Sequence, residues 1–374
     1  MAEPVKYHYG EFPPKRIDWE KLIPLIGPAN AELARYDGAL SAVPNPDILL
    51  TPLTTQEAVL SSKIEGTQAT MGEVLEYEAQ QGDIVDLSPE RKADIFEVLN
   101  YRKAIWQATE LLQKLPLCER VIREAHKVLL HNVRGHNKAP GEYRKFQNWI
   151  GVDGTVIEKA RFVPISPERL PDGMKEWEKY IHRQEPDKLV QLAILHAEFE
   201  ALHPFLDGNG RIGRMFVPLF LYKMGLIQSP MFYISAFFET NREEYYERLL
   251  AVSRDRNWTG WCEFFLIALK AQAKENQQKT SAILKLYESK KKQIHEAFRS
   301  LYAGHALDLM FERPIFKTSD LTRGAQISEP TAKRIISELR NTSIIKVLRE
   351  GKGRRSTIYV FAELINIAEG KTIF

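Results

Sequence analysis

Cysteine is scarce in this chain, in which Cys118 and Cys262 are the only two among 374 residues. Two cysteines cannot form a disulfide framework, so the sequence indicates a reducing compartment. Long apolar runs are lacking as well. The apolar stretch from Met215 to Tyr222 contains Pro218 and is far shorter than the ~20 residues that cross a bilayer. The first residues also lack the layout of a signal peptide. We therefore expect a soluble cytoplasmic protein with no membrane partner.

An excess of one charge is also lacking, because 52 lysines and arginines face 49 aspartates and glutamates, a formal net charge of +3. This balance excludes a protein that binds polyanions through its overall charge, so any nucleic-acid role has to be local. Hydrophobic residues make up 44% of the chain, which excludes a disordered scaffold. The length predicts two or three domains, and no internal repeat is visible.

Helical periodicity dominates the pattern, so we expect a mainly α fold. The stretch Thr54–Glu57 resembles a capping box, and Ser88 followed by Pro89 predicts another helix start. Gly66 is expected just beyond the end of the helix that the capping box opens. The expected helices cover about 28–37, 54–65, 70–81, 89–114, 117–131, 167–183 and 186–202.

A short β-hairpin is expected to interrupt this helical pattern between residues 147 and 165. Two apolar runs, Trp149–Val152 and Val156–Ile157, flank the dipeptide Asp153-Gly154, which favours a tight turn. Because the tip is polar, we expect one strand edge to be exposed. Such an edge can hold an extended target segment by main-chain hydrogen bonds.

The composition changes near residue 270. The stretch Lys270–Lys292 is polar and predicts an exposed connecting helix. Three helices are expected after it, at about 303–311, 318–324 and 328–341, followed by two strands that flank the basic segment 351–355. This order is typical of a winged helix. The sequence therefore predicts three domains, at 1–110, 111–272 and 273–374.

A winged helix raises the question of DNA binding. Residues 317–374 hold 11 lysines and arginines against 6 aspartates and glutamates, a larger surplus than that of the whole chain. Part of it lies at the expected wing tip, at Lys352, Arg354 and Arg355, where winged helices contact phosphates. A surface that docks a protein or a second subunit would explain the same charges. DNA binding is therefore an alternative that we do not favour.

The segment that carries chemistry runs from His203 to Arg214 and reads His-Pro-Phe-Leu-Asp-Gly-Asn-Gly-Arg-Ile-Gly-Arg. Pro204 disfavours helix at His203 and so predicts a chain reversal there. The glycine-rich turn that follows lets the backbone approach a ligand, and the new helix start presents N–H groups to an anion. Arg211 and Arg214 share a helix face, where their guanidinium groups can hold phosphate oxygens. The segment therefore predicts a phosphate site.

Two further side chains give this site its chemistry. Asp207 is next to the anion site and is a candidate ligand for a phosphate-bound Mg²⁺. Histidine ordinarily titrates near neutrality, so His203 can act as a general base toward an attacking hydroxyl. A rival interpretation is a metal site, because His196, Glu200 and His203 lie on one helix face at i, i+4 and i+7. It leaves the glycines and arginines unexplained.

At every specified position the segment matches the Fic-family motif, His-x-Phe-x-Asp/Glu-Gly-Asn-Gly-Arg-x-x-Arg. The chain resembles that family from about Pro14 to Ala268. Gly141–Arg144 looks like the start of its catalytic core and Trp149–Pro164 like its substrate flap. The resemblance implies a helical Fic fold that transfers AMP from ATP to a Ser, Thr or Tyr hydroxyl of a target protein and of itself, releasing diphosphate. A homodimer is a further expectation.

The resemblance also implies roles for single residues. His203 would deprotonate the target hydroxyl, Asp207 would hold Mg²⁺, and Phe205 would pack the motif into the core. Asn241 and Tyr246 look like the wall of the adenine pocket. Arg211 would contact the inner phosphates and Arg214 the γ-phosphate. The implied nucleotide-binding set within the motif is Gly208, Asn209, Gly210, Arg211, Ile212, Gly213 and Arg214.

The segment from Ser61 to Gly66 fits the family's inhibitory-helix pattern, Ser/Thr-x-x-x-Glu-Gly/Asn. A carboxylate at a helix C-terminus is unfavourable with the helix dipole, so Glu65 needs a cationic partner elsewhere. Arg214 is the candidate, and the pair would occupy the guanidinium meant for the γ-phosphate. Ser61 would hold the glutamate or contact the core. We therefore expect an adenylyltransferase that Glu65 inhibits.

Three alternatives stay open. The enzyme could use UTP or GTP in place of ATP, or it could remove AMP from its targets. A protein of another class, a winged-helix regulator that binds DNA and senses a nucleotide through its helical body, would also account for the two halves of the sequence.

Overall fold

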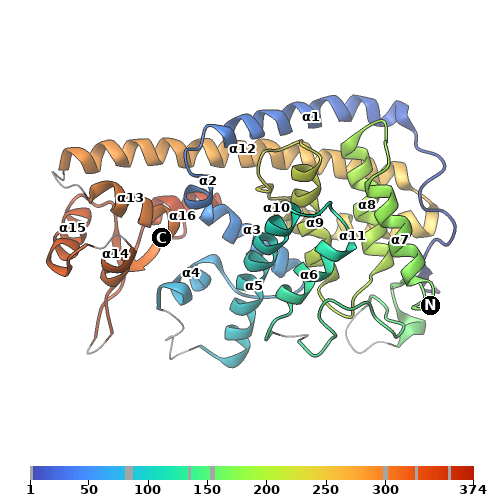
Figure 1. Ribbon diagram of the computed structural model, residues 1–374, viewed down its shortest axis with the longest axis horizontal. Coiled ribbons are helices and arrows are strands. Elements are labelled where there is room, and N and C mark those ends of the chain that lie inside the picture. The colour runs from blue at the N-terminus through green and yellow to red at the C-terminus, as the bar shows by residue number, and fades with distance from the viewer. Residues whose placement is uncertain are drawn as a thin grey trace. The chain divides into compact units, whose positions relative to one another are not determined.

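The computed structural model confirms a mainly helical fold with small sheets (Figure 1). Among its described helices, none combines the length and the apolar character that crossing a membrane requires. The chain forms two compact units. One comprises Met1–Asp37, Leu60–Thr67 and Leu99–Lys274, and the other Gly38–Val59, Gln68–Val98 and Glu275–Phe374. The structure describes residues 3–80, 87–133, 136–151, 156–297, 302–324, 327–352 and 355–374.

The first unit is built around α8 (Lys188–Leu202), whose side chains are almost all buried, as is typical of a central helix. α7 (Leu170–Ile181) and α9 (Asn209–Lys223) pack against it. Its other helices are α6 (Glu119–Leu129), α10 (Ser235–Thr240), α11 (Arg242–Asp255) and parts of α1 (Trp19–Ser41), α3 (Thr51–Ile64), α5 (Pro89–Leu112) and α12 (Trp258–Ala297).

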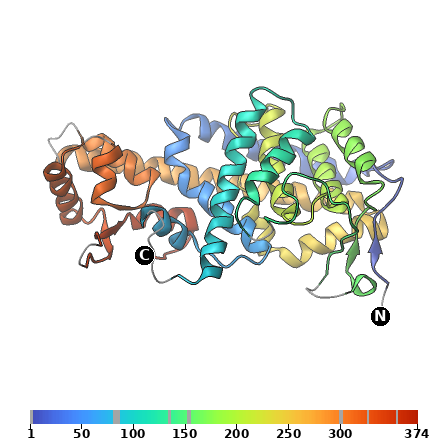
Figure 2. The same cartoon turned by 60° about the horizontal axis from the view of Figure 1, so that its bottom comes forward.

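A parallel strand pair ties the start of the chain to the first unit. β1 (Val5–Lys6) pairs with β2 (Phe162–Val163), and Figure 2 shows the two strands side by side. Just beyond β1, the Tyr7 hydroxyl donates to Oε1 of Glu198 at 2.6 Å, and Nε2 of His8 donates to Oε2 of the same carboxylate at 2.8 Å. We call residues 5–8 the N-terminal arm. The arm supplies both donors to a buried carboxylate.

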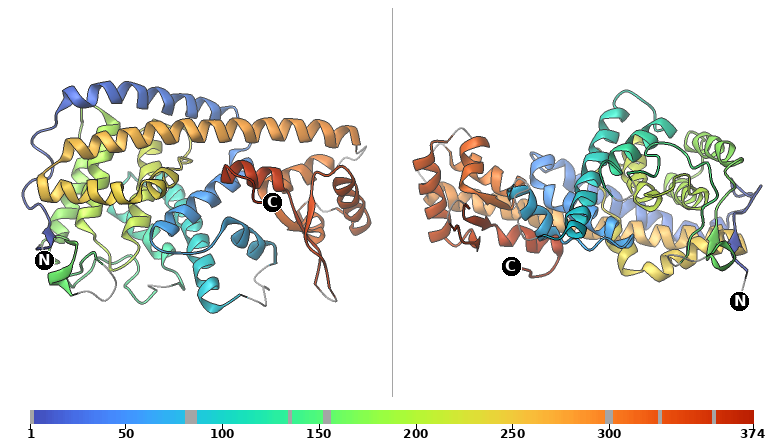
Figure 3. Two further views of the ribbon diagram at one scale, coloured as in Figure 1. Left: turned by 180° about the vertical axis from the view of Figure 1, so that it is seen from behind. Right: turned by 90° about the horizontal axis from the view of Figure 1, so that it is seen from below.

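The second unit contains a three-stranded antiparallel sheet in the order β3-β5-β4 (Figure 3). The succession of helix, strand, two helices and two strands includes the three helices and the hairpin that the sequence predicts; β3 and the last helix were not predicted. Of the expected wing tip, residues 353 and 354 lie outside the described residues. The elements are α2 (Pro46–Leu49), α4 (Met71–Gln80), α13 (Ala303–Glu312), β3 (Ile315–Lys317), α14 (Thr318–Gly324), α15 (Glu329–Asn341), β4 (Lys346–Arg349), β5 (Ile358–Val360) and α16 (Ala362–Glu369).

Two helices are longer than the sequence predicts. α1 begins at Trp19 and keeps Pro24 and Pro28 inside it, whereas only 28–37 was expected to be helical. Each proline removes one backbone donor, but Leu22 and Ala29 are fully buried, so packing outweighs the lost bonds. The expected connecting helix is the second half of α12, which runs without a break for 40 residues (Figure 3).

The prediction of a capping box at Thr54 is wrong. α3 begins one turn earlier, and the Thr54 hydroxyl donates back to the carbonyl of Leu50 at 3.3 Å. A helix-interior threonine often makes this bond, which sequence alone does not distinguish from a cap. The two reciprocal hydrogen bonds of a capping box are found at the start of α4. There Oε2 of Glu73 accepts from the Thr70 N–H at 2.8 Å, and Oγ1 of Thr70 accepts from the Glu73 N–H at 3.3 Å.

The end of α3 follows the prediction. Gly66 has a φ of 98° and donates its N–H to the carbonyl of Lys63 at 2.9 Å, while the Thr67 N–H reaches the carbonyl of Ser62 at 3.2 Å. These two bonds are those of a glycine-terminated helix end. Glu65 is thereby placed as the last residue before the chain turns away.

The hairpin around Asp153-Gly154 matches the prediction only in part. Ile150 pairs antiparallel with Phe162, but Ile157–Lys159 is a 3₁₀ turn and not the return strand. The returning strand is β2, which β1 stabilises from a distant part of the sequence. Residues 152–155, which include the turn, lie outside the described residues. β2 has Ile150 on one side and β1 on the other, so both of its edges are paired within the chain.

Asp187 caps the start of α8, and we expect Asp187→Ala to destabilise the protein by about 1 kcal/mol. Its Oδ1 accepts from the N–H groups of Leu189 and Val190, both at 2.9 Å, so alanine leaves two first-turn donors without their acceptor. The shift of the urea or thermal unfolding midpoint measures the loss. Asp187→Ser can still cap and should keep most of the stability. Equal losses in both variants would contradict a capping role.

Candidate functional site

The His203–Arg214 segment connects α8 to α9 through a loop whose polar groups are used internally. His203 is the left-handed residue that ends α8, with a φ of 47°, as Pro204 led us to expect. Gly208, with a φ of 77°, precedes α9. The buried amide of Asn209 accepts from the Phe205 N–H at 2.8 Å and donates to the Phe205 carbonyl at 2.9 Å. The loop is therefore fixed before any ligand binds.

Arg144 holds the reversal at His203 from the outside. Its Nε donates to the His203 carbonyl at 3.0 Å, and its Nη2 donates to the carbonyls of Leu202 and Ile165. The Arg144 backbone N–H donates to the carbonyl of Pro204 at 2.9 Å. With a further bond from Nη1 to the Phe146 carbonyl at 3.3 Å, the side chain serves four carbonyls, more than the three donors of a lysine could. The sequence placed Arg144 in a family-like stretch but gave no sign of this role.

His126, on α6, is a second support that the sequence did not reveal. Its Nδ1 accepts from the Gly141 N–H at 2.8 Å, so its Nε2 carries the proton and donates to the Asp207 carbonyl at 2.9 Å. The ring stacks on buried Phe205, with the centroids 3.7 Å apart. Burial lowers the pKa of His126 to about 4, so the neutral ring keeps both bonds at ordinary pH.

The imidazole of His203 lines the cavity described below and is a neutral base. Burial lowers its pKa to about 4, with Glu65 opposing this shift and Arg144 adding to it. Its Nδ1 is buried away from the cavity, and a backbone hydrogen bond to Glu200 raises the pKa of the ring slightly against the effect of burial. A neutral imidazole has one nitrogen without a proton and can take a proton from a ligand hydroxyl.

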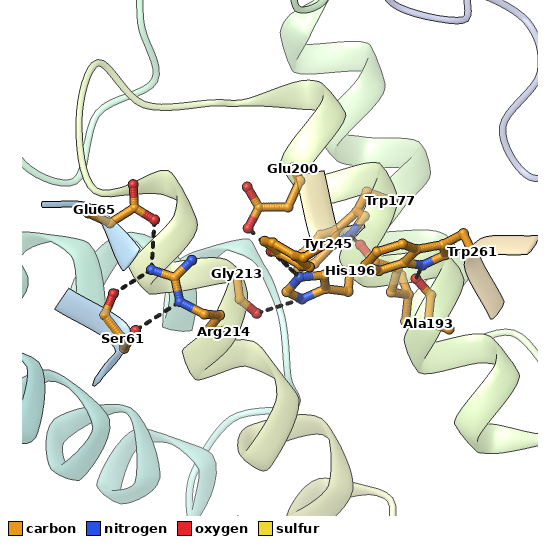
Figure 4. Close-up of polar contacts among 11 residues, drawn as sticks. Ser61, Glu65, Trp177, Ala193, His196, Glu200, Gly213, Arg214, Tyr245 and Trp261 are labelled. Carbon is orange, nitrogen blue, oxygen red and sulfur yellow. Dashed lines mark hydrogen bonds and ion pairs between the residues drawn. The ribbon is translucent and has the colours of Figure 1, made fainter. Parts of the chain in front are cut away.

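The structure brings Glu65 and Ser61 to Arg214 (Figure 4). Nη2 of Arg214 donates to Oε1 of Glu65 and to the Ser61 carbonyl, both at 2.7 Å, and Nε donates to the Ser61 hydroxyl at 3.0 Å. Burial disfavours the charged forms of both side chains. The attraction between Glu65 and Arg214 is larger than this effect, so the pKa of Glu65 lies below its ordinary value and that of Arg214 lies above.

Gly210 and Gly213 make room for two carboxyl groups on the surface of α9. A Cβ on Gly210 would lie 2.2 Å from Oε1 of Glu65, and a Cβ on Gly213 would lie 2.3 Å from Oε1 of Glu200. Both positions are helical, so these glycines serve close approach and not an unusual backbone conformation. Ile212, between them, is buried and packs in the core.

The start of α9 carries the elements of an anion site. The first-turn N–H groups have no acceptor within the helix, and the helix dipole adds partial positive charge there. Nη2 of Arg211 lies 3.2 Å from Oδ1 of Asp207 in an ion pair, in which the Asp207 side chain keeps 30% of its exposure. A polyanion at this position would meet the partly positive first-turn N–H groups of α9 and the guanidinium of Arg211.

A cavity of about 680 Å³ lies beside these groups, within the first unit. This volume suits a small ligand. Tyr246 contributes to its wall. Asn241 does not belong to the wall; it precedes α11 and its amide donates to the Phe237 carbonyl at 2.9 Å. The charged residues of the wall are the cations Lys159, Arg161, Arg214 and Arg242 and the carboxyl groups Glu65 and Glu200.

The metal interpretation of His196, Glu200 and His203 is not supported. Nδ1 of His196 donates to the Gly213 carbonyl at 3.0 Å, and Nε2 therefore accepts from the Tyr245 hydroxyl at 2.9 Å. Both ring nitrogens are thus occupied by protein groups. In the part of the chain that the structure describes, no three His, Cys, Asp or Glu side chains are grouped as metal ligands.

Comparison with known families accounts for this arrangement. Residues 23–110 match the model of the Fic/DOC family N-terminal region, and residues 116–221 match that of the Fic/DOC family. The chain carries both domains of the Fic/DOC family. The first match contains Glu65 and the second contains the whole His203–Arg214 segment.

Named relatives of the chain are protein adenylyltransferases. A probable protein adenylyltransferase of Aquifex aeolicus is 28% identical over 201 residues, which cover 53% of this chain and 54% of the relative. A protein adenylyltransferase of Caenorhabditis elegans is 31% identical over 74 residues, 19% of this chain and 15% of that protein. The chain thus spans about half the length of one and a small part of the other.

Solved structures share the fold. A Fic family protein from Desulfovibrio desulfuricans has a TM-score of 0.59 at 21% identity, and the match covers 93% of this chain and 98% of that one. The Fic-1 fragment from C. elegans has a TM-score of 0.53 at 18% identity over 72% of this chain and 75% of its own.

We expect Arg144→Lys to destabilise the Fic-domain protein by about 1–3 kcal/mol, since an ammonium group cannot satisfy several buried carbonyls at once. Thermal unfolding measures the change. Lys145→Ala is the matched control, because Lys145 is exposed and only approaches Glu142, at 3.8 Å. If Arg144→Lys melted with the control, the contacts of Arg144 would contribute little to the fold.

Proposed function

We propose that this protein is an adenylyltransferase, which transfers AMP from ATP to a hydroxyl group of a target protein and of itself and releases diphosphate. One observation carries the proposal: the imidazole of a neutral His203 and the guanidinium of Arg214 line the same cavity. The base and the phosphate-binding group are therefore placed to act on one ligand. The named relatives support the same reaction.

The reaction follows from these positions. His203 takes the proton of the attacking hydroxyl, the oxygen forms a bond to the α-phosphorus, and the bond to the β-phosphate oxygen breaks. The start of α9 and Arg211 bind the inner phosphates, and Arg214 binds the terminal one. Because His203, Arg144 and Asn209 are held by internal bonds, the site is largely organised before the substrates arrive.

Asp207 fits the magnesium ion that such a reaction uses. Mg²⁺ in nucleotide sites is commonly held by one or two carboxylates together with phosphate oxygens, and Asp207 is a partly exposed carboxylate beside the anion site. The ion, when bound, neutralises charge on the phosphates. His126 fixes the backbone of Asp207 and so the direction from which that carboxylate approaches.

Glu65 holds this enzyme in an inhibited state. Its carboxylate and Ser61 take up the Nε and Nη2 groups of Arg214, which a terminal phosphate would otherwise bind. A nucleotide that enters the cavity with Glu65 in place meets a neutralised guanidinium and is held in a non-productive pose. Withdrawal of the end of α3 would activate transfer.

We infer that the second unit is a winged helix that contacts a protein and not DNA. Its sheet order and helices suit that fold. Arg349 of β4 pairs with Glu76 of α4 at 2.7 Å, so one basic group of the wing is used within the unit. This pairing favours protein contact over DNA binding for that strand, and a steep fall of DNA affinity with salt would show the opposite.

His203→Ala should abolish the transfer of label from α-labelled ATP while leaving ATP binding largely intact. The loss of a positioned base costs about 10²–10⁴-fold in rate. Labelling of lysate proteins and calorimetric ATP binding are the two readouts. His182→Ala, which removes an exposed histidine of the same unit, is the control. Full labelling by His203→Ala would refute the mechanism.

Glu65→Gly should raise auto-modification and target labelling about tenfold or more, since it removes a charged hydrogen bond that competes with the substrate. Arg214→Ala should be inactive whether or not Glu65 is present. Lys63→Ala is the matched control, because it removes an exposed ion pair with Glu239 from the same helix end and leaves Arg214 untouched. Equal rates for Glu65→Gly and wild type at saturating ATP and Mg²⁺ would make Glu65 an ordinary surface residue.

A further inference from the structure

Glu200 is a buried carboxyl group in the nucleotide cavity that the mechanism leaves unused. In the view of Figure 4, Glu65 and Glu200 flank the side chain of Arg214. The side chain of Glu200 is 12% exposed and lines the cavity. Each carboxyl group interacts electrostatically with Arg214 and with the other. Arg214 thus has two acidic neighbours, of which Glu65 makes the hydrogen bond.

The hydrogen bonds around Glu200 favour its protonated form. Its Oε1 has no hydrogen-bond partner among the described side chains and backbone. Nε2 of His196, 3.9 Å away, is an acceptor, because Nδ1 donates to the Gly213 carbonyl. The Tyr245 hydroxyl donates to that same Nε2, and its hydrogen bond toward Glu200 lowers the pKa of that carboxyl group. A hydroxyl has one proton for these two acceptors, so the Glu200 carboxylate competes with His196 for its donor, whereas a protonated Glu200 does not need it.

The charges around Glu200 come from three other elements. Arg214 faces it from α9, Glu65 from the end of α3, and Tyr245 and Tyr246 from α11. Burial raises the pKa of Glu200 to about 7, Arg214 opposes this shift and Glu65 adds to it. Whether a second anion is present beside Arg214 therefore decides how Glu200 is charged near neutral pH.

We propose that Glu200 couples nucleotide binding to proton uptake: it holds a proton when an anion occupies Arg214 and ionises when none does. This inference rests on the proposed function, in which a terminal phosphate replaces Glu65 on Arg214. With neither anion present, the Glu200 carboxylate is the remaining counter-ion of the buried guanidinium. When the phosphate arrives, the cavity regains a negative charge and Glu200 takes up a proton from solvent.

The absence of a side chain at Gly213 makes room for the carboxyl group of Glu200. The Glu200 oxygen lies where a side chain at position 213 would be, 2.3 Å from the site of a Cβ. Gly213 precedes Arg214 in α9, so the close approach keeps the carboxyl group beside the guanidinium. The same helix seats Glu65 over Gly210 one turn earlier. The two glycines therefore provide two acidic positions for one cation.

The sign of the pH dependence follows from linkage. In Glu65→Gly, Glu200 is ionised before ATP binds and protonated afterwards, so its pKa is higher in the complex. ATP affinity should be constant below the lower of the two pKa values, fall by up to about tenfold per pH unit between them, and level off above the higher one. In the wild type the Glu65 carboxylate already occupies Arg214 before ATP binds, so an anion lies beside Arg214 in both states and the dependence should be much weaker.

Calorimetry of ATP binding tests this in buffers of different ionisation enthalpy, between about pH 6 and 8. Glu65→Gly should take up as much as about one proton per ATP, and the wild type distinctly less. The double variant Glu65→Gly/Glu200→Gln should lose the uptake, whereas Glu65→Gly/Glu200→Asp should keep part of it. Glu65→Gly/Glu243→Gln, which removes an exposed charge of α11, should behave like Glu65→Gly. Ionisation of ATP itself is common to all variants and cancels in the comparison.

Equal proton uptake with and without the Glu200 carboxyl group would overturn the inference. Equal uptake by the wild type and Glu65→Gly would overturn it as well, and that comparison uses chains in which Glu200 is intact. AMP, which lacks the terminal phosphate, should bind to Glu65→Gly without this uptake. If no variant bound ATP, the proposed function would fail, and the coupling would fail with it.

Discussion

The site is organised by a cation that the fold buries. The Arg214 side chain is 1% exposed, and a charge removed from water to that extent requires a partner. The proposed reaction requires the opposite, since Arg214 can bind a terminal phosphate only if its present partners give way. Under that proposal Glu65 meets both demands, because it neutralises Arg214 when no phosphate is bound and comes from a helix end that does not carry the His203–Arg214 loop.

The remaining polar groups of the site divide into fixed and exchangeable ones. Arg144, His126 and Asn209 satisfy backbone groups around His203, and nothing in their bonding depends on a ligand. The contacts of Arg214 with Ser61 and Glu65 are different, because a phosphate can replace each of them. His203 is thus held rigidly, whereas Glu65, the counter-ion of Arg214, can be replaced. In the proposed reaction this arrangement would allow activity to be regulated without moving His203.

Local signals in the sequence predicted most of the helix ends and the catalytic loop. Ser88 does cap α5, accepting from the Arg91 N–H at 3.2 Å, and Pro204 marks the reversal at His203. These features depend on residues a few positions apart, which a sequence shows directly. Thr54 misled because a threonine hydroxyl serves equally at a cap and inside a helix.

The features that sequence could not reveal depend on distant partners. β2 exists because β1, more than a hundred residues away, pairs with it. His126 and Arg144 look like ordinary helix and loop residues until the fold places them against the loop that follows α8. Glu200 was considered only as a metal ligand, because its significance depends on Arg214, which lies between it and Glu65 in the view of Figure 4. Motif spacing identifies residues that touch the substrate, whereas the residues that hold them are identified by the fold.

The N-terminal arm shows that the folding unit and the family boundary differ. The match to the model of the family's N-terminal region begins at residue 23, yet the arm at residues 5–8 completes the sheet at β2 and donates twice to the buried Glu198 carboxylate. A recombinant fragment cut at the homology boundary would keep every catalytic residue. It would also leave Glu198 buried without these two donors and open an edge of β2 to pairing between molecules. For this chain, the shortest stable fragment should therefore be longer than the region that the family models match.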